Sequence, residues 1–100
     1  MNKRMRTVVE EQIVQDKIDA ARKKYKRLED IYGGLSWRLA REPESGMPIN
    51  KQSPNIFLIK IDSVSDIQLP GILVVYSYDD NQVNILDIRI DAPPVIKKKS

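Results

Sequence analysis

The sequence predicts an α+β domain in which a helical hairpin packs on a small antiparallel sheet. Apolar residues recur at steps of three and four between residues 14 and 39, which is the period of an amphipathic helix. Alternating apolar residues at 56–61 and 71–90 are typical of half-buried strands. The β-branched segment Thr7-Val8-Val9 could add an edge strand before them. The expected order of elements is β-α-α-β-β-β.

The helical segment is expected to end by Arg41, because Glu42 precedes a proline and is pushed out of helical conformation. Its apolar stripe consists of Val14, Ile18, Ala21, Tyr25, Leu28, Tyr32, Leu35 and Leu39. An unbroken helix would be about 45 Å long, whereas a domain of this length has a radius of gyration of about 13 Å. The segment should therefore fold back, either at the basic cluster 23–27 or at Gly33-Gly34. We favour the first break, because the apolar stripe runs unaltered through the glycines.

The second half of the chain is expected to supply the remaining strands. Within residues 71–90, Asp79-Asp80-Asn81-Gln82 separates two alternating halves and is typical of a hairpin turn. Pro93 and Pro94 should end the last strand, because proline cannot donate to a sheet ladder. We expect one domain over residues 1–94, followed by a flexible basic tail at 95–100.

Composition narrows the classes of function. The 100 residues include neither cysteine nor histidine, which removes the commonest zinc ligands and the usual general base near pH 7. No apolar run approaches the roughly 20 residues that a membrane-spanning helix needs. We therefore expect a cytoplasmic domain without metal, cofactor or membrane.

The net charge of +3 is distributed unevenly along the chain. Residues 1–41 hold 11 Lys/Arg and 6 Asp/Glu, whereas residues 42–96 hold three basic residues and eight carboxylates. A surface that binds phosphate would have to come from the first half or from the tail.

Three groups of residues are candidates for a site. The first group is four carboxylates that could bind Mg²⁺ or act as acid and base: Asp79, Asp80, Asp87 and Asp91. Asp79 and Asp80, however, suit a turn, and Asp87 can pair with Arg89 on one sheet face. Tyr76 and Tyr78 alternate with apolar residues and are interpreted as core packing. The same interpretation is favoured for the sole tryptophan, Trp37, over a contact hot spot.

The third group is the basic surface of the helical segment: Lys17, Arg22, Lys23, Lys24, Lys26, Arg27, Arg38 and Arg41. A run of this kind is usually a solvated face. The alternative is a surface that binds RNA, DNA or an acidic partner segment. For that alternative we select Arg22, Lys23, Lys26, Arg27 and Arg41 as the binding residues.

Four segments, in order, resemble the RelE/ParE superfamily of bacterial toxin–antitoxin toxins. RTVVEEQIVQDKIDAARKKYKRLED is similar to the opening strand, first helix and KKY junction of RelE-like chains. LSWRLAREPESGMPI is similar to the second helix and its exit, and IFLIKIDS to the strand that often reads KiR. PGILVVYSYDDNQVNILDI resembles the hairpin G-R-V-I-Y…D…V-x-L-L-x-I. The likeness covers most of residues 6–90.

The resemblance implies a toxin that a cognate antitoxin neutralises, with functions such as growth inhibition and plasmid stabilisation. RelE-like members cleave mRNA on the ribosome, and ParE-like members inhibit DNA gyrase. Cleavage of RNA without a metal needs a base, an acid and a cation near the phosphate. By the resemblance, Lys60 would hold the phosphate, Tyr76 would act as acid or base, and Arg89 would stabilise charge.

Two positions depart from the motifs of the family. Leu73 stands where the hairpin motif has arginine, and Asp62 stands where KiR ends in arginine. An arginine would clamp a phosphate, whereas leucine cannot, and Asp62 would repel it. We therefore expect either a toxin component or a degenerate relative of one. The alternative is a non-catalytic protein-interaction module of the same fold that has no toxicity.

Overall fold

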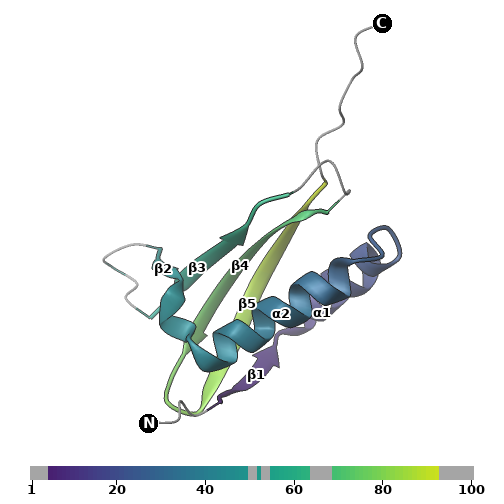
Figure 1. The fold of residues 1–100 in the computed structure, drawn as a ribbon. Coiled ribbons are helices and arrows are strands. Elements are labelled where there is room, and N and C mark those ends of the chain that lie inside the picture. The colour runs from purple at the N-terminus through teal and green to yellow at the C-terminus, as the bar shows by residue number, and fades with distance from the viewer. Residues whose placement is uncertain (1–4, 50–51, 53–54, 64–68, 93–100) are drawn as a thin grey trace, which may run out of the picture.

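The computed structural model describes residues 5–49, 52, 55–63 and 69–92, in which two helices pack on a five-stranded mixed sheet (Figure 1). The expected α+β class is confirmed. The elements are β1 (Thr7–Glu10), α1 (Gln12–Arg22), α2 (Leu28–Arg41), the 3₁₀ turn η1 (Pro43–Ser45), β2 (Met47–Pro48), β3 (Phe57–Ile61), β4 (Gly71–Tyr78) and β5 (Gln82–Asp91). The predicted tail at 95–100 lies outside the described residues.

The strands are ordered β1-β5-β4-β3-β2, and the expectation of an antiparallel sheet is wrong at one edge. β3, β4 and β5 pair antiparallel as expected, and β2 adds a two-residue strand beside β3. β1 is the expected edge strand, but it runs parallel to β5, with Thr7 opposite Gln82 and Glu10 opposite Ile85. The two helices return the chain across the sheet between β1 and the antiparallel strands, and a crossover of this kind permits parallel pairing.

The helical segment breaks at residues 23–27, as we favoured. α1 ends at Arg22 and α2 begins at Leu28. Gly33 and Gly34 lie within α2 and are exposed, and a Cβ atom added at either would meet nothing within 4 Å. The glycines therefore neither break the helix nor serve its packing.

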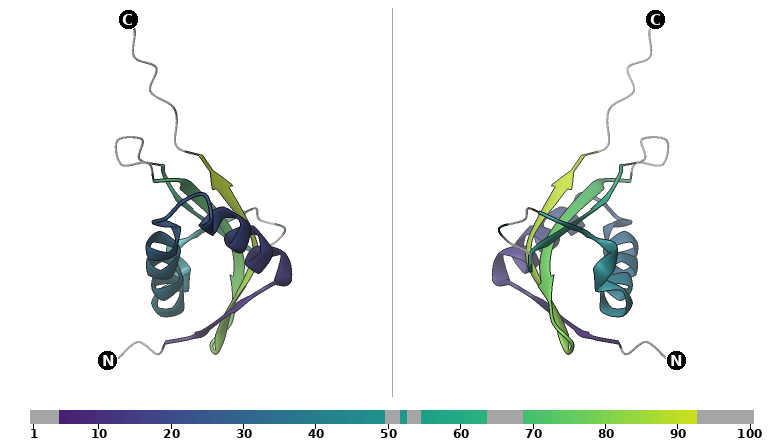
Figure 2. Two further views of the ribbon diagram at one scale, coloured as in Figure 1. Left: turned by 90° about the vertical axis from the view of Figure 1, so that its right-hand side faces the viewer. Right: turned by 90° about the vertical axis from the view of Figure 1, so that its left-hand side faces the viewer.

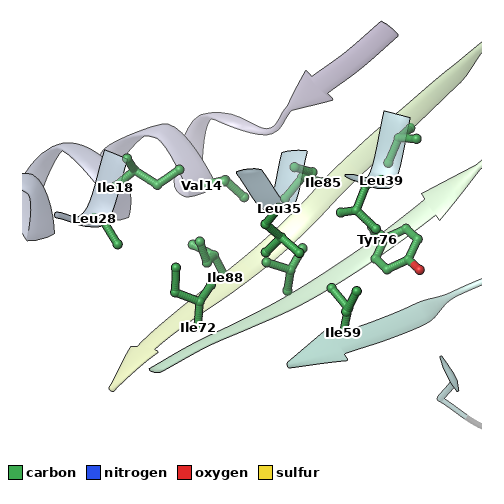
Figure 3. Close-up of a cluster of buried hydrophobic side chains, with 12 residues drawn as sticks. Val14, Ile18, Leu28, Leu35, Leu39, Ile59, Ile72, Tyr76, Ile85 and Ile88 are labelled. Carbon is green, nitrogen blue, oxygen red and sulfur yellow. The ribbon is translucent and has the colours of Figure 1, made fainter. Parts of the chain in front are cut away.

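The core lies between the helices and one face of the sheet (Figure 3). Its buried members are Val14, Ile18, Leu28, Leu35, Leu39, Ile59, Ile72, Val74, Tyr76, Val83, Ile85 and Ile88. The predicted helical stripe supplies five of them, and its other three members are partly buried against the same cluster. The opposite face of the sheet, here called the far face, carries Leu58, Lys60, Leu73, Val75 and Arg89, because side chains alternate along each strand.

Trp37 is not in the core, so that prediction is wrong. Its side chain is 56% exposed, and the guanidinium carbon of Arg41 lies 4.3 Å from the centre of its ring. Helical residues are spaced about 100° apart, which places Trp37 on the opposite side of α2 from buried Leu35.

No helix in the described ranges is long and apolar enough to cross a membrane.

β5 contains one irregularity that shapes its outer edge. Val75 is opposite Asp87 and Tyr76 is opposite Ile85, so Leu86 is an extra residue on β5. A bulge of this kind bends the strand and changes which backbone groups face each side. β1 pairs with β5 only from Gln82 to Ile85, so the bulge begins where the parallel partner ends.

Candidate functional site

The structure separates the three residues that the resemblance assigned to catalysis. Lys60 is opposite Leu73, and Leu73 is opposite Arg89, so the two cations lie in one row on the far face. Tyr76 belongs to the core, on the other side of the sheet (Figure 3). Its side chain is fully buried. In this arrangement a phosphate held by Lys60 and Arg89 does not meet the hydroxyl of Tyr76.

The hydroxyl of Tyr76 is bound to the turn that follows α2. It donates a hydrogen bond to the carbonyl oxygen of Pro43 at 2.6 Å and accepts one from the backbone N–H of Gly46 at 3.0 Å. Burial raises the pKa of Tyr76 above its usual value. Gly46 permits this approach, since a Cβ there would lie 2.1 Å from the Tyr76 hydroxyl oxygen. The hydroxyl thus joins the sheet to η1.

The two cations on the far face each have a carboxylate partner two residues along the strand. The Nζ atom of Lys60 lies 3.5 Å from Oδ1 of Asp62, and the Nε atom of Arg89 lies 2.9 Å from Oδ1 of Asp91. Both pairs are exposed. The row therefore has no excess positive charge with which to hold an RNA backbone.

The carboxylates of the hairpin behave largely as turn and surface residues. Asp79 accepts hydrogen bonds from the backbone N–H groups of Asn81 and Gln82 at 2.7 and 2.8 Å, which lowers its pKa. The interpretation of Asp79 as a turn residue is confirmed. The expected pairing of Asp87 with Arg89 is wrong, because Asp87 turns to α1. Across the described ranges, no group of three or more acidic side chains is placed to hold a metal ion.

The selected basic residues do not form one surface. Lys23, Lys26 and Arg27 are exposed at the junction between the helices. Arg22 sits beside them, but it is held by Glu29 at 2.6 Å. Arg41 lies at the other end of α2, about 20 Å along the helix. The structure therefore brings four of the five residues together and leaves Arg41 with Trp37.

Next to this junction, a groove of about 600 Å³ lies between α1 and β5. It is lined by Lys17, Ala20, Ala21, Lys24, Tyr25, Asp87, Ile88, Arg89 and Ile90. Its volume falls in the range of about 300–1,000 Å³ that is usual for ligand sites. Ala20 and Ala21 are small, so the helix wall leaves the groove open.

An ion pair crosses the groove. The Nζ atom of Lys17 lies 2.8 Å from Oδ1 of Asp87 and donates to the carbonyl oxygen of Ile88 at 3.2 Å. Oδ1 of Asp87 also accepts the backbone N–H of Ile88 at 2.8 Å. The hydrogen bond from Lys17 is the main cause of a lowered pKa of Asp87, and the Ile88 N–H adds to it.

Sequence reasoning did not find this groove. Lys17 was placed in the basic surface and Asp87 in the hairpin, 70 residues apart. A signal was present in α1, where Lys17, Ala20 and Ala21 recur at helical spacing and so share one side of the helix. No pattern indicated that this side would meet β5.

Comparison with known proteins adds no assignment. No family model matches the chain, and neither the curated proteins nor the solved structures include a significant match.

Proposed function

We propose that this chain is a non-catalytic protein-interaction module that binds an extended segment of a partner protein in the groove between α1 and β5. The observation that carries the proposal is the groove itself, which runs along the edge of β5 beyond its pairing with β1, beside a helix wall of small residues. An extended peptide can add a strand to such an edge, with affinity from main-chain hydrogen bonds and specificity from the side chains around it.

The arrangement of the assigned catalytic residues supports a binding function over RNA cleavage. Tyr76 is buried on the opposite side of the sheet from Lys60 and Arg89. Both cations are accompanied by carboxylates. Acid–base catalysis requires groups within hydrogen-bond reach of one substrate, and these three residues do not converge on a common point.

The RelE/ParE resemblance indicates which kind of protein would supply the bound segment. In that setting the chain is a degenerate relative of a toxin, and the bound segment belongs to a cognate antitoxin. A toxin acting on ribosome-bound mRNA or on DNA gyrase is the competing hypothesis, and it predicts arrest of growth.

The first test separates binding from catalysis. The chain is expressed in a bacterial host while growth and pulse-labelled protein synthesis are followed together, and the purified protein is assayed for ribosome-dependent mRNA cleavage. We expect normal growth and no cleavage, with the double variant Lys60→Ala/Arg89→Ala indistinguishable from the parent. Cleavage by the parent that the double variant loses would contradict the proposal.

The second test asks whether the groove binds peptides. A random library of displayed 12-residue peptides is selected against the parent and against Ala20→Trp, which fills the groove from an exposed position. The control Gln15→Trp adds the same ring at an exposed position of α1 that does not line the groove. We expect peptides that bind the parent and Gln15→Trp but not Ala20→Trp. Failure to select any such peptide would refute binding in the groove.

A further inference from the structure

Among the described residues, the second half of β5 has no strand partner along one of its edges. β1 accompanies β5 only as far as Ile85, whereas the pairing of β5 with β4 continues to Asp91. Figure 1 shows β5 extending beyond the end of β1, and the left view of Figure 2 shows α1 crossing in front of it. An unpaired edge of this kind is a template for another strand unless the protein blocks it.

The hydrogen bonds of Ile88 show which way this edge faces. The N–H and C=O groups of one strand residue point to the same side, and residues two apart repeat that direction. Both backbone groups of Ile88 are bound by side chains in the groove. Ile90, two residues farther along, therefore presents its backbone groups to the groove as well, and it is one of the residues that line it.

The ion pair occupies the edge at Ile88. The carboxylate of Asp87 accepts a hydrogen bond from the Ile88 N–H, and the ammonium group of Lys17 donates one to the Ile88 carbonyl oxygen. The same two side chains bind each other at 2.8 Å. Together they make the contacts with Ile88 that the backbone of an added strand would make.

This block is weak enough to be displaced. The side chains of Lys17 and Asp87 are 44% and 52% exposed, and ion pairs this accessible to water contribute little to stability. Water or a new ligand can replace either partner without leaving a buried charge.

The charges around the groove select the chemistry of the occupant. Of the cations that line the groove, Lys17 is paired with Asp87 and Arg89 with Asp91, whereas Lys24 has no carboxylate partner among the described residues. Lys23, Lys26 and Arg27 continue the positive charge at the helix junction. An incoming carboxylate can replace Asp87 as the partner of Lys17, which a neutral or basic segment cannot do.

We propose that the ion pair between Lys17 and Asp87 is a displaceable gate on the open edge of β5, and that an extended acidic segment opens it by pairing with Ile88 and Ile90. A side-chain carboxylate of the segment binds Lys17. A backbone carbonyl oxygen of the segment accepts a hydrogen bond from the Ile88 N–H, and a backbone N–H of the segment donates one to the Ile88 carbonyl oxygen. This inference rests on the proposed function and adds the charge of the segment and the regulation of the groove.

The test uses a fluorescein-labelled 10-residue peptide of alternating glutamate and valine, with binding followed by fluorescence anisotropy. In Asp87→Ala the Ile88 N–H is free and the carboxylate that repels the peptide is gone. We expect the affinity to rise about fivefold to tenfold, since one hydrogen bond no longer has an internal competitor. The control Asp16→Ala removes the same charge from an exposed position of α1 outside the groove and should leave the affinity unchanged.

Further arms keep the test decisive. Asp87→Asn, which retains an acceptor for the Ile88 N–H, should bind with an affinity between those of the parent and Asp87→Ala, and circular dichroism checks that each variant is folded. A lysine–valine peptide and a glutamate–valine peptide N-methylated at alternate residues should not bind. Slower hydrogen exchange at the amides of Ile88 and Ile90 in the complex would place the peptide at the edge.

Equal affinity of the parent and Asp87→Ala would overturn the gate, as would equal binding of the N-methylated peptide. If the library yields peptides that require the groove while the acidic probe fails, the proposed function stands and this inference fails. If neither binds, both fail.

Discussion

Replacing Tyr76 with phenylalanine should destabilise the fold while leaving its shape unchanged. The substitution removes only the hydroxyl, and a phenylalanine ring fills the remaining space in the core. Two backbone groups lose their partner: the carbonyl of buried Pro43, now 2.6 Å from the hydroxyl oxygen, and the half-buried N–H of Gly46 at 3.0 Å.

The magnitude follows from those two groups. A buried backbone group without a hydrogen-bond partner costs about 1–3 kcal/mol. The cost of leaving the Pro43 carbonyl without a partner should fall well within this range. The cost for the N–H of Gly46 should lie near its lower end, because water reaches a half-buried group more readily. We expect a loss of about 2–4 kcal/mol, a large part of the ~5–15 kcal/mol that stabilises a typical domain.

Urea unfolding followed by circular dichroism measures this loss. The matched control is Tyr78→Phe, since the Tyr78 hydroxyl makes no hydrogen bond within the described ranges, although its ring packs near Phe57 and Arg6. The control should change the free energy of unfolding by less than ~0.5 kcal/mol. A loss for Tyr76→Phe no larger than that of the control would refute the argument that this hydroxyl ties η1 to the sheet.

Three other changes test the packing and the ion pair. Gly33→Ala and Gly34→Ala should each raise the free energy of unfolding in urea by about 0.5–1 kcal/mol, because the new methyl group meets open space and alanine favours the helix; a loss would contradict this. Gly46→Ala should cost at least ~2 kcal/mol in the same assay, because its Cβ would lie 2.1 Å from the Tyr76 hydroxyl oxygen; an unchanged midpoint would show that this contact relaxes. The folded-state pKa of Asp87 lies below the ordinary value of 3.8, so its contribution to stability is present above that value and is lost as the pH falls through the folded-state pKa. Urea midpoints measured from pH 6 to pH 2 should therefore fall less in Asp87→Asn than in the parent, and parallel curves would refute the linkage.

The local elements of this fold were predictable because their signals are local. The helical period, set against the size of a domain, predicted two helices, and the apolar stripe that continues through Gly33-Gly34 favoured the break at 23–27. Alternation around Asp79 was sufficient for the hairpin, and the Asp79 side chain then caps its turn through Asn81 and Gln82. These signals depend on residues within a few positions of one another.

The predictions that were wrong concern how distant segments of the chain pack against one another. The direction of β1 relative to β5 depends on how the chain crosses the sheet, and no residue of β1 encodes it. Trp37 lies beside the apolar stripe in the sequence, which favours the core, but its helical position turns it away from Leu35. Asp87 was paired with its neighbour Arg89, because α1 was not known to approach from the other side.

The sequence by itself determined the α+β class, the helical hairpin, the β4–β5 hairpin and most of the core, because periodicity and turn chemistry act through neighbouring residues. Only the tertiary structure decided the groove. It depends on the bulge at Leu86, on the end of β1 opposite Ile85, and on an ion pair between residues 70 positions apart. Each of these is a relation between distant segments, and such relations follow from the packing of whole elements rather than from any local pattern.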